Sequence, residues 1–119
     1  MKEVLSKEMP ADMARRVIRW NVPIAKGLRV EVPQRCHVIG VELNHVNNDT
    51  VDVWLEVPAD DGADDGGVMD VIFTVFGTGD VIPATKSLQE PWYRHLGSVR
   101  DFHAGFAWHL YAAVVDWRA

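Results

Sequence analysis

The part of this sequence best suited to binding chemistry is a loop shaped by glycines. An apolar run at 71–76 ends at Gly77, Thr78 and Gly79, and Pro83 closes the turn that follows. Successive glycine N–H groups can form a nest that holds an anion such as phosphate. The pattern G-x-x-x-x-G-K-[ST] is absent, and Ile82 stands where a dinucleotide-binding motif needs glycine. The alternative is a strand-end turn that requires positive φ.

The acidic and histidine residues do not form a metal-binding pattern. The five histidines show no HExxH or other close spacing, and a single cysteine is available to assist them. A calcium loop starting at Asp60 would place Gly62 at its third ligand position. One starting at Asp61 would place Ala63 there, so neither supplies the required oxygen. We therefore expect no metal and no cofactor, and an exposed loop at 58–70.

No arrangement of nucleophile and base is visible in the sequence. Cys36 adjoins His37, but neighbouring residues of a strand point to opposite faces. Ser87 and Ser98 lack the strand-turn-helix context of a nucleophile elbow. We expect a protein that is not an enzyme.

The aromatic residues are more informative, because five tryptophans are many for 119 residues. Trp54 lies on the polar side of its predicted strand. In the last strand Phe106, Trp108, Leu110 and Ala112 share one face, and the opposite face carries His109 and Tyr111. Trp54, Arg94, His109 and Tyr111 can therefore form one aromatic and cationic surface, which would be a ligand pocket. The alternatives are a second core layer or a subunit interface.

These two features together define a candidate ligand site. Arg94 or His95 would add charge at the glycine loop, and Trp54 or Trp92 would stack on a base or ring. The full candidate set is Gly77, Thr78, Gly79, Trp54, Trp92, Arg94, His95, His109 and Tyr111.

The elements that must position these residues are almost all strands. Residues 1–16 form the one candidate helix, because Met9, Met13 and Val17 recur every four residues. From Val17 the period becomes two, with seven predicted strands at 17–25, 28–32, 36–46, 50–57, 71–76, 93–102 and 105–115. The residues expected to face the core in the first four strands are Ile18, Trp20, Val22 and Ile24; Leu28, Val30 and Val32; Ile39, Val41 and Leu43; and Val51, Val53, Leu55 and Val57. This pattern predicts an all-β domain at 17–119, a sandwich or small barrel of about seven strands, preceded by an arm or short helix at 1–16.

Composition limits the classes of function. A chain of 119 residues suits one domain, and its net charge of −5 argues against direct DNA or RNA binding. One cysteine cannot form an internal disulfide, and there is no apolar run long enough to span a membrane. We expect a cytoplasmic protein without membrane association.

Three segments resemble a family of small proteins encoded mainly by bacteriophages and prophages. They read FGTGDVIP at 76–83, YRHLGSV at 93–99 and AWHLY at 107–111, with weaker matches at 22–24, 30–33 and 53–57. The similar region runs from Trp20 to Tyr111, whereas residues 1–16 and 112–119 depart from the family's usual ends. The resemblance implies a phage accessory protein, and it supplies no catalytic residues because none are established for the family.

We therefore expect a non-enzymatic phage protein that binds a ligand or partner in the host cytoplasm. By analogy with other small phage domains, it would counter host defence by sequestering a nucleotide-type immune signal or by binding a defence protein. The alternative is a structural virion component, such as a decoration or head–tail joining protein. Surplus aromatic residues and unpaired sheet edges also predict a homo-oligomer.

Overall fold

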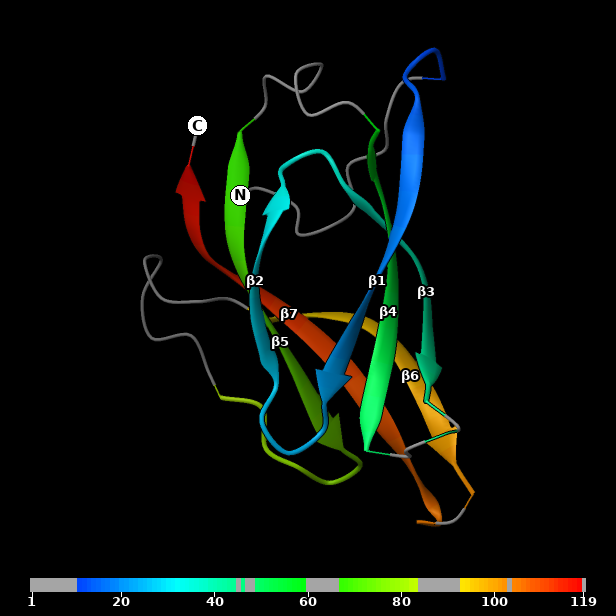
Figure 1. Ribbon diagram of the computed structural model, residues 1–119. Helices are drawn as coiled ribbons and strands as arrows, with labels where there is room; N and C mark the ends of the chain where they lie inside the picture. The colour runs from blue at the N-terminus through cyan, green and yellow to red at the C-terminus, as the bar shows by residue number, and fades with distance from the viewer. Residues whose placement is uncertain are drawn as a thin grey trace.

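The computed structural model describes residues 11–44, 46, 49–59, 67–83, 93–102 and 104–118. Its strands form two antiparallel sheets packed face to face, one with the order β1-β4-β3 and one with the order β2-β5-β7-β6 (Figure 1). The strands are β1 (Arg15–Pro23), β2 (Leu28–Pro33), β3 (His37–Leu43), β4 (Thr50–Pro58), β5 (Val68–Gly77), β6 (Tyr93–Asp101) and β7 (Phe106–Arg118). The all-β fold class expected from the sequence is confirmed.

Alternation of apolar and polar residues builds the core between the two sheets. Phe73 of β5 and Leu55 of β4 are the largest side chains that are fully buried. Burial of such a side chain contributes about 1.5–3 kcal/mol relative to exposure. The residues predicted to face the core at 17–25, 28–32 and 50–57 all belong to this core or pack against it.

The predicted helix at 1–16 is wrong over its described part. Residues 11–14 form a turn and bend, and β1 begins at Arg15. Arg15 and Arg16 pair in register with Pro58 and Val57 of β4, and Arg15 forms an ion pair with Glu56 at 3.2 Å. These cross-strand partners hold the two arginines in the sheet, and residues 1–10 lie outside the described residues.

The described residues include no helix capable of spanning a membrane.

One predicted core residue of the third strand is also wrong. The register of β3 against β4 shifts between Val38 and Gly40, so that Ile39 is the extra residue of a β-bulge. Ile39 is therefore exposed, and Val38 takes its place against the core. Beyond the bulge the alternation resumes, and Val41 and Leu43 face inward as predicted.

The turn between β6 and β7 is fixed by a buried carboxylate. Asp101 accepts hydrogen bonds from the main-chain N–H of Ala104 and from Nε1 of Trp108, both at 3.0 Å. The N–H of Gly105 donates to the Asp101 carbonyl, and Gly105 has a φ of 78°. Asp101 thus ties Ala104 and Gly105 to the first tryptophan of β7.

An ion pair crosses the outer face of β2 and β5. Nη2 of Arg29 lies 2.6 Å from Oδ2 of Asp70, and Nε lies 3.1 Å from both carboxylate oxygens. The hydrogen bonds from Arg29 lower the pKa of Asp70, and partial burial opposes this shift. The stabilisation that this pair gives the folded state is complete at pH values above the ordinary pKa of aspartate. It is lost as pH falls through the lowered pKa of Asp70.

Replacing Arg29 by Met is therefore expected to raise the titration midpoint of Asp70, because the stabilising donor is lost while the burial remains. The measurement is a carboxyl-detected NMR titration of both proteins. Equal midpoints for Asp70 in the wild type and in Arg29→Met would contradict this account.

Candidate functional site

Two N–H groups of the glycine loop already have hydrogen-bond acceptors within the protein. The N–H of Gly77 donates to the Asp80 carboxylate at 2.7 Å, and the N–H of Thr78 donates to the Ala107 carbonyl at 3.1 Å. Gly79 has a φ of 96°, which satisfies the alternative interpretation of a turn that requires positive φ. An external anion at Gly77 would have to displace Asp80, so the loop is built first as a strand-end turn.

Thr78 connects this loop to a row of polar side chains on the outer face of the four-stranded sheet. Thr78 Oγ1 lies 3.0 Å from Nε2 of His109, and Nδ1 of His109 lies 2.7 Å from Ser98 Oγ. Ser98 Oγ also lies 2.8 Å from Nε2 of His95. We call these four residues, contributed by β6, β7 and the loop after β5, the polar row.

The hydrogen bonds of the polar row run in one direction. Thr78 Oγ1 lies 3.1 Å from the Ala107 carbonyl, which can only accept, so the hydroxyl donates there. Thr78 then accepts from Nε2–H of His109, which leaves Nδ1 as the acceptor for the Ser98 hydroxyl. Ser98 in turn accepts from Nε2–H of His95. Both imidazoles therefore carry their proton on Nε2 in the neutral form.

This assignment predicts a single tautomer for neutral His109. We expect long-range ¹H–¹⁵N NMR spectra above the histidine titration range to show Nε2 protonated and Nδ1 bare. Thr78→Val removes the acceptor for Nε2–H and should introduce the Nδ1–H form. An Nδ1–H tautomer in the wild-type protein would contradict the direction of the row.

A cluster of rings lies beside the polar row. Phe76 contacts Tyr111 and Tyr93 edge to face, with ring centroids 5.4 and 5.9 Å apart. The rings of His95 and Tyr111 are 5.2 Å apart. Edge-to-face aromatic pairs contribute about 0.5–1.5 kcal/mol beyond the area that they bury. We call Phe76, Tyr93 and Tyr111 the aromatic cluster, and together with the polar row it forms a continuous surface over β5, β7 and β6.

The structure brings five of the predicted site residues together and separates others. Gly77, Thr78, His95, His109 and Tyr111 lie along this surface, and Gly79 lies in the loop next to it.

The grouping of Trp54 and Arg94 with these residues is wrong. Trp54 belongs to β4 in the other sheet, where the guanidinium carbon of Arg19 lies 5.3 Å from its ring centroid. Arg94 pairs in register with the buried Ala112, so it leaves β6 on the side opposite to His95. Trp92 lies outside the described residues.

Ser98, Phe76 and Tyr93 were missed as members of the site. The register of β6 against β7 shifts between His95 and Gly97. In a regular strand His95 and Ser98, three residues apart, would point to opposite faces, but the bulge places both on the outer face. The partners of Ser98 thus depend on an irregularity that the spacing of the residues does not reveal.

The polar row brings together two hydroxyls and two imidazoles. The Ser98 hydroxyl and His109 Nδ1 are at the distance of a nucleophile and its base. However, the third member is the Thr78 hydroxyl, and a carboxylate is the group that would stabilise an imidazolium in a catalytic triad. No group of three or more metal-ligating His, Cys, Asp or Glu side chains occurs among the described residues. Rings, hydroxyls and imidazoles on an accessible sheet are suited to stacking and hydrogen bonding.

The chain matches the model of one protein family. The match to the domain of unknown function DUF7352 covers residues 13–117, so the chain belongs to that family. The family's range starts two residues before β1 and covers all seven strands except the last residue of β7. No curated protein and no solved structure matches the chain.

Proposed function

We propose that this DUF7352 protein is a non-enzymatic binding protein and that the outer face of β5, β7 and β6 is its binding surface. The observation that carries the proposal is the contact between the polar row and the aromatic cluster. Imidazole, hydroxyl and phenol groups there offer both donors and acceptors next to ring surfaces. Tyrosine is a residue type that is enriched at recognition surfaces, because one side chain combines a large apolar area with a polar end.

A nucleotide-type small molecule is the ligand that this chemistry suits best. Stacking of a base on an aromatic side chain contributes about 1–3 kcal/mol. In the assigned direction of the polar row, Nδ1 of His95 is an acceptor for the edge of a base, and the phenol of Tyr111 beside it is a donor. The glycine loop contributes through Thr78 at the edge of the surface, because its N–H groups at Gly77 and Thr78 already have partners.

The biological setting that we propose is a bacteriophage or prophage. The segments at 76–83, 93–99 and 107–111 that resemble phage-encoded proteins are also the segments that build this surface. In that setting the protein would act in the host cytoplasm and counter host defence, either by sequestering a nucleotide immune signal or by binding a defence protein through the same surface. A structural virion component is the second candidate, and mass spectrometry of purified virions would identify it.

The test combines a thermal-shift screen with paired variants. A nucleotide present at a hundred times its Kd should stabilise the fold by about 2.7 kcal/mol. His95→Ala and Tyr111→Ala should each weaken binding of a nucleotide found in this screen at least tenfold. Trp54→Ala is the matched control, because it removes a large aromatic side chain from the outer face of the opposite sheet.

The outcomes separate the two kinds of ligand. If no mononucleotide, cyclic nucleotide or dinucleotide shifts the melting temperature, the small-molecule proposal is wrong. A host protein retained by the wild type and by Trp54→Ala, but lost from Tyr111→Ala, would then support the partner-binding form. If His95→Ala, Tyr111→Ala and Trp54→Ala all bind the ligand or partner equally well, the assignment of this surface is wrong.

A further inference from the structure

We propose that Arg100 forms a phosphate subsite at the hairpin end of the binding surface, so that a nucleotide lies with its base on the aromatic cluster and a phosphate over Ala107. This inference rests on the proposed function and deepens it, because it assigns the charged end of the ligand. Two N–H groups of the glycine loop already have acceptors, and the polar row contains no permanently charged group. A phosphate therefore needs a partner beyond these residues.

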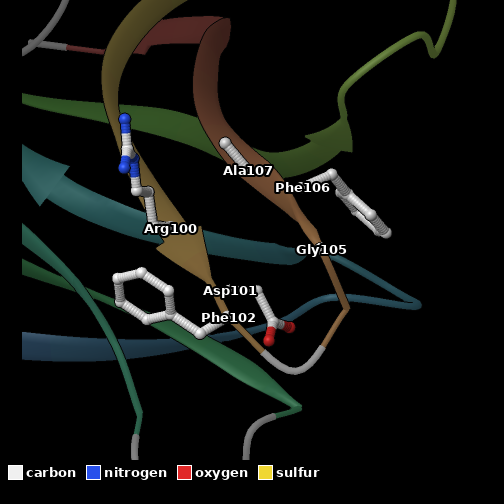
Figure 2. A pocket seen from close by; sticks show the side chains of 6 residues that line it. All are labelled: Arg100, Asp101, Phe102, Gly105, Phe106 and Ala107. Atoms are coloured by element: carbon white, nitrogen blue, oxygen red, sulfur yellow. The ribbon is translucent and has the colours of Figure 1, made fainter.

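The pairing register places Arg100 on the same face as the polar row. Arg100 pairs with Ala107, and Ser98 pairs with His109 two positions further along both strands. Residues two positions apart in a strand share a face and lie about 6.6 Å apart. Figure 2 shows the Arg100 side chain and the Ala107 methyl group on one side of the hairpin and the Phe106 ring on the other. Arg100 thus continues the polar row toward the hairpin.

Ala107 leaves space beside the guanidinium, because its side chain is a single methyl group. It lies between Arg100 of β6 and Thr78 of the glycine loop, whose main-chain N–H and hydroxyl both donate to the Ala107 carbonyl at 3.1 Å. Arg100 and Ala107 are among the residues that line an open cavity of about 280 Å³ at this hairpin (Figure 2). A phosphate can therefore approach the guanidinium without obstruction from the residue paired with it.

Within the part of the chain that the structure describes, Arg100 is an exposed cation outside the two ion pairs. Arg15 and Arg29 are held by carboxylates, and the guanidinium of Arg19 lies over the Trp54 ring. A guanidinium presents a planar fork of N–H donors that matches two oxygens of a phosphate. Arg100 can therefore make a bidentate contact with a phosphate without giving up an ion pair to a described residue.

Two described carboxylates at this end of the sheet are already engaged elsewhere. Asp101 is buried and accepts a hydrogen bond from the Trp108 indole. Asp80 accepts the N–H of Gly77 in the loop after β5, and β7 separates β5 from β6 in the sheet. Neither forms an ion pair with the guanidinium. The positive charge therefore remains available to an anion, although the whole chain carries a net charge of −5.

The spacing along β7 limits the size of the ligand. Tyr111 and Ala107 are four residues apart, which corresponds to about 13 Å along a strand. The Arg100 side chain extends back along β6, away from the hairpin tip, so its guanidinium lies within that span (Figure 2). A nucleoside di- or triphosphate is long enough to contact both the aromatic cluster and Arg100. A nucleoside covers the aromatic cluster and leaves Arg100 without a phosphate.

Isothermal titration calorimetry of the full chain with adenosine, ADP and ATP, and with guanosine, GDP and GTP, tests the proposal. We expect a di- or triphosphate to bind the wild type at least about tenfold more tightly than its nucleoside, because hydrogen bonds to charged groups are among the stronger ones. Arg100→Gln should abolish this preference, with unchanged nucleoside affinity and melting temperature. Arg19→Gln is the matched control, because it removes the same charge from an exposed arginine of the other sheet, and it should retain the preference.

The outcomes separate the phosphate subsite from the binding surface. Equal binding of nucleoside and nucleotide by the wild type, or a preference that Arg100→Gln retains, overturns the subsite and leaves the binding surface in place.

Inorganic pyrophosphate tests the subsite without a base. It should shift the NMR signals of the Arg100 Nε–H and the Ala107 main-chain N–H, but not that of the Arg19 Nε–H. Sodium chloride of equal ionic strength should leave all three signals in place. Such shifts in a protein that binds none of the six compounds would support the subsite and contradict the nucleotide form of the proposed function. If pyrophosphate causes no shift and none of the six compounds binds, both proposals are wrong.

Discussion

Replacing Gly27 by alanine is expected to lower the free energy of unfolding by about 3 kcal/mol, with two physical causes. Gly27 has a φ of 69°, where an L-residue costs about 1–2 kcal/mol. A Cβ built there would also lie 2.6 Å from the carbonyl oxygen of Phe73, a main-chain atom of β5 that cannot rotate away. Such overpacking typically costs 1–3 kcal/mol. Thermal unfolding should show a melting temperature lower by about 10–15 °C.

Gly105→Ala separates the two causes. Gly105 has a similar φ of 78°, but a Cβ built there meets no atom within 4 Å. This variant should therefore show the conformational cost alone, about 1 kcal/mol. If Gly27→Ala and Gly105→Ala are equally destabilised, the close approach of the β1–β2 turn to Phe73 has no energetic consequence.

Replacing Asp101 by alanine is expected to cost about 2–4 kcal/mol. The substitution leaves the Trp108 indole N–H and the Ala104 main-chain N–H without their acceptor. A buried donor left unsatisfied costs about 1–3 kcal/mol, and solvent at the turn reduces the cost for Ala104. Urea unfolding with an unchanged m-value would measure the loss.

Asp101→Asn provides the graded comparison. The amide keeps the shape of the side chain and one acceptor oxygen, but its NH₂ group faces the other donor. We expect roughly half of the destabilisation that alanine produces. An asparagine variant as unstable as alanine would mean that the negative charge matters more than the number of hydrogen bonds.

The fold was predictable from local patterns, and the candidate site was predictable only in part. Strand identity follows from period-two alternation, which holds in β1, β2 and β4. Which residues of two neighbouring strands lie on the same face depends on the register of the pairing, and two bulges change that register. A regular strand would place Ile39 in the core and would put His95 and Ser98 on opposite faces, and the bulges change both outcomes.

Which sheet a strand joins is the other information that the sequence did not contain. Trp54 and His109 have equivalent polar-side positions in their own strands, but the strands belong to different sheets. The sequence also could not show whether the N–H groups of the glycine loop are free or already bonded. Gly77 and Thr78 could have left their N–H groups free for an anion, and only the placement of Asp80 and Ala107 shows that these groups are already bonded.

The bulges in β3 and β6 also affect how the protein behaves at high concentration. Both strands lie at sheet edges, where a regular strand would offer free N–H and C=O groups to another chain. An extra residue in each interrupts that ladder, so a foreign strand cannot pair along its whole length. The edge strand β1 has regular pairing with β4 but carries Arg15, Arg16 and Arg19, whose like charges repel a second β1 strand. Three of the four sheet edges are thereby protected against extension by a foreign strand, and seeding a concentrated solution with preformed cross-β aggregates tests this protection.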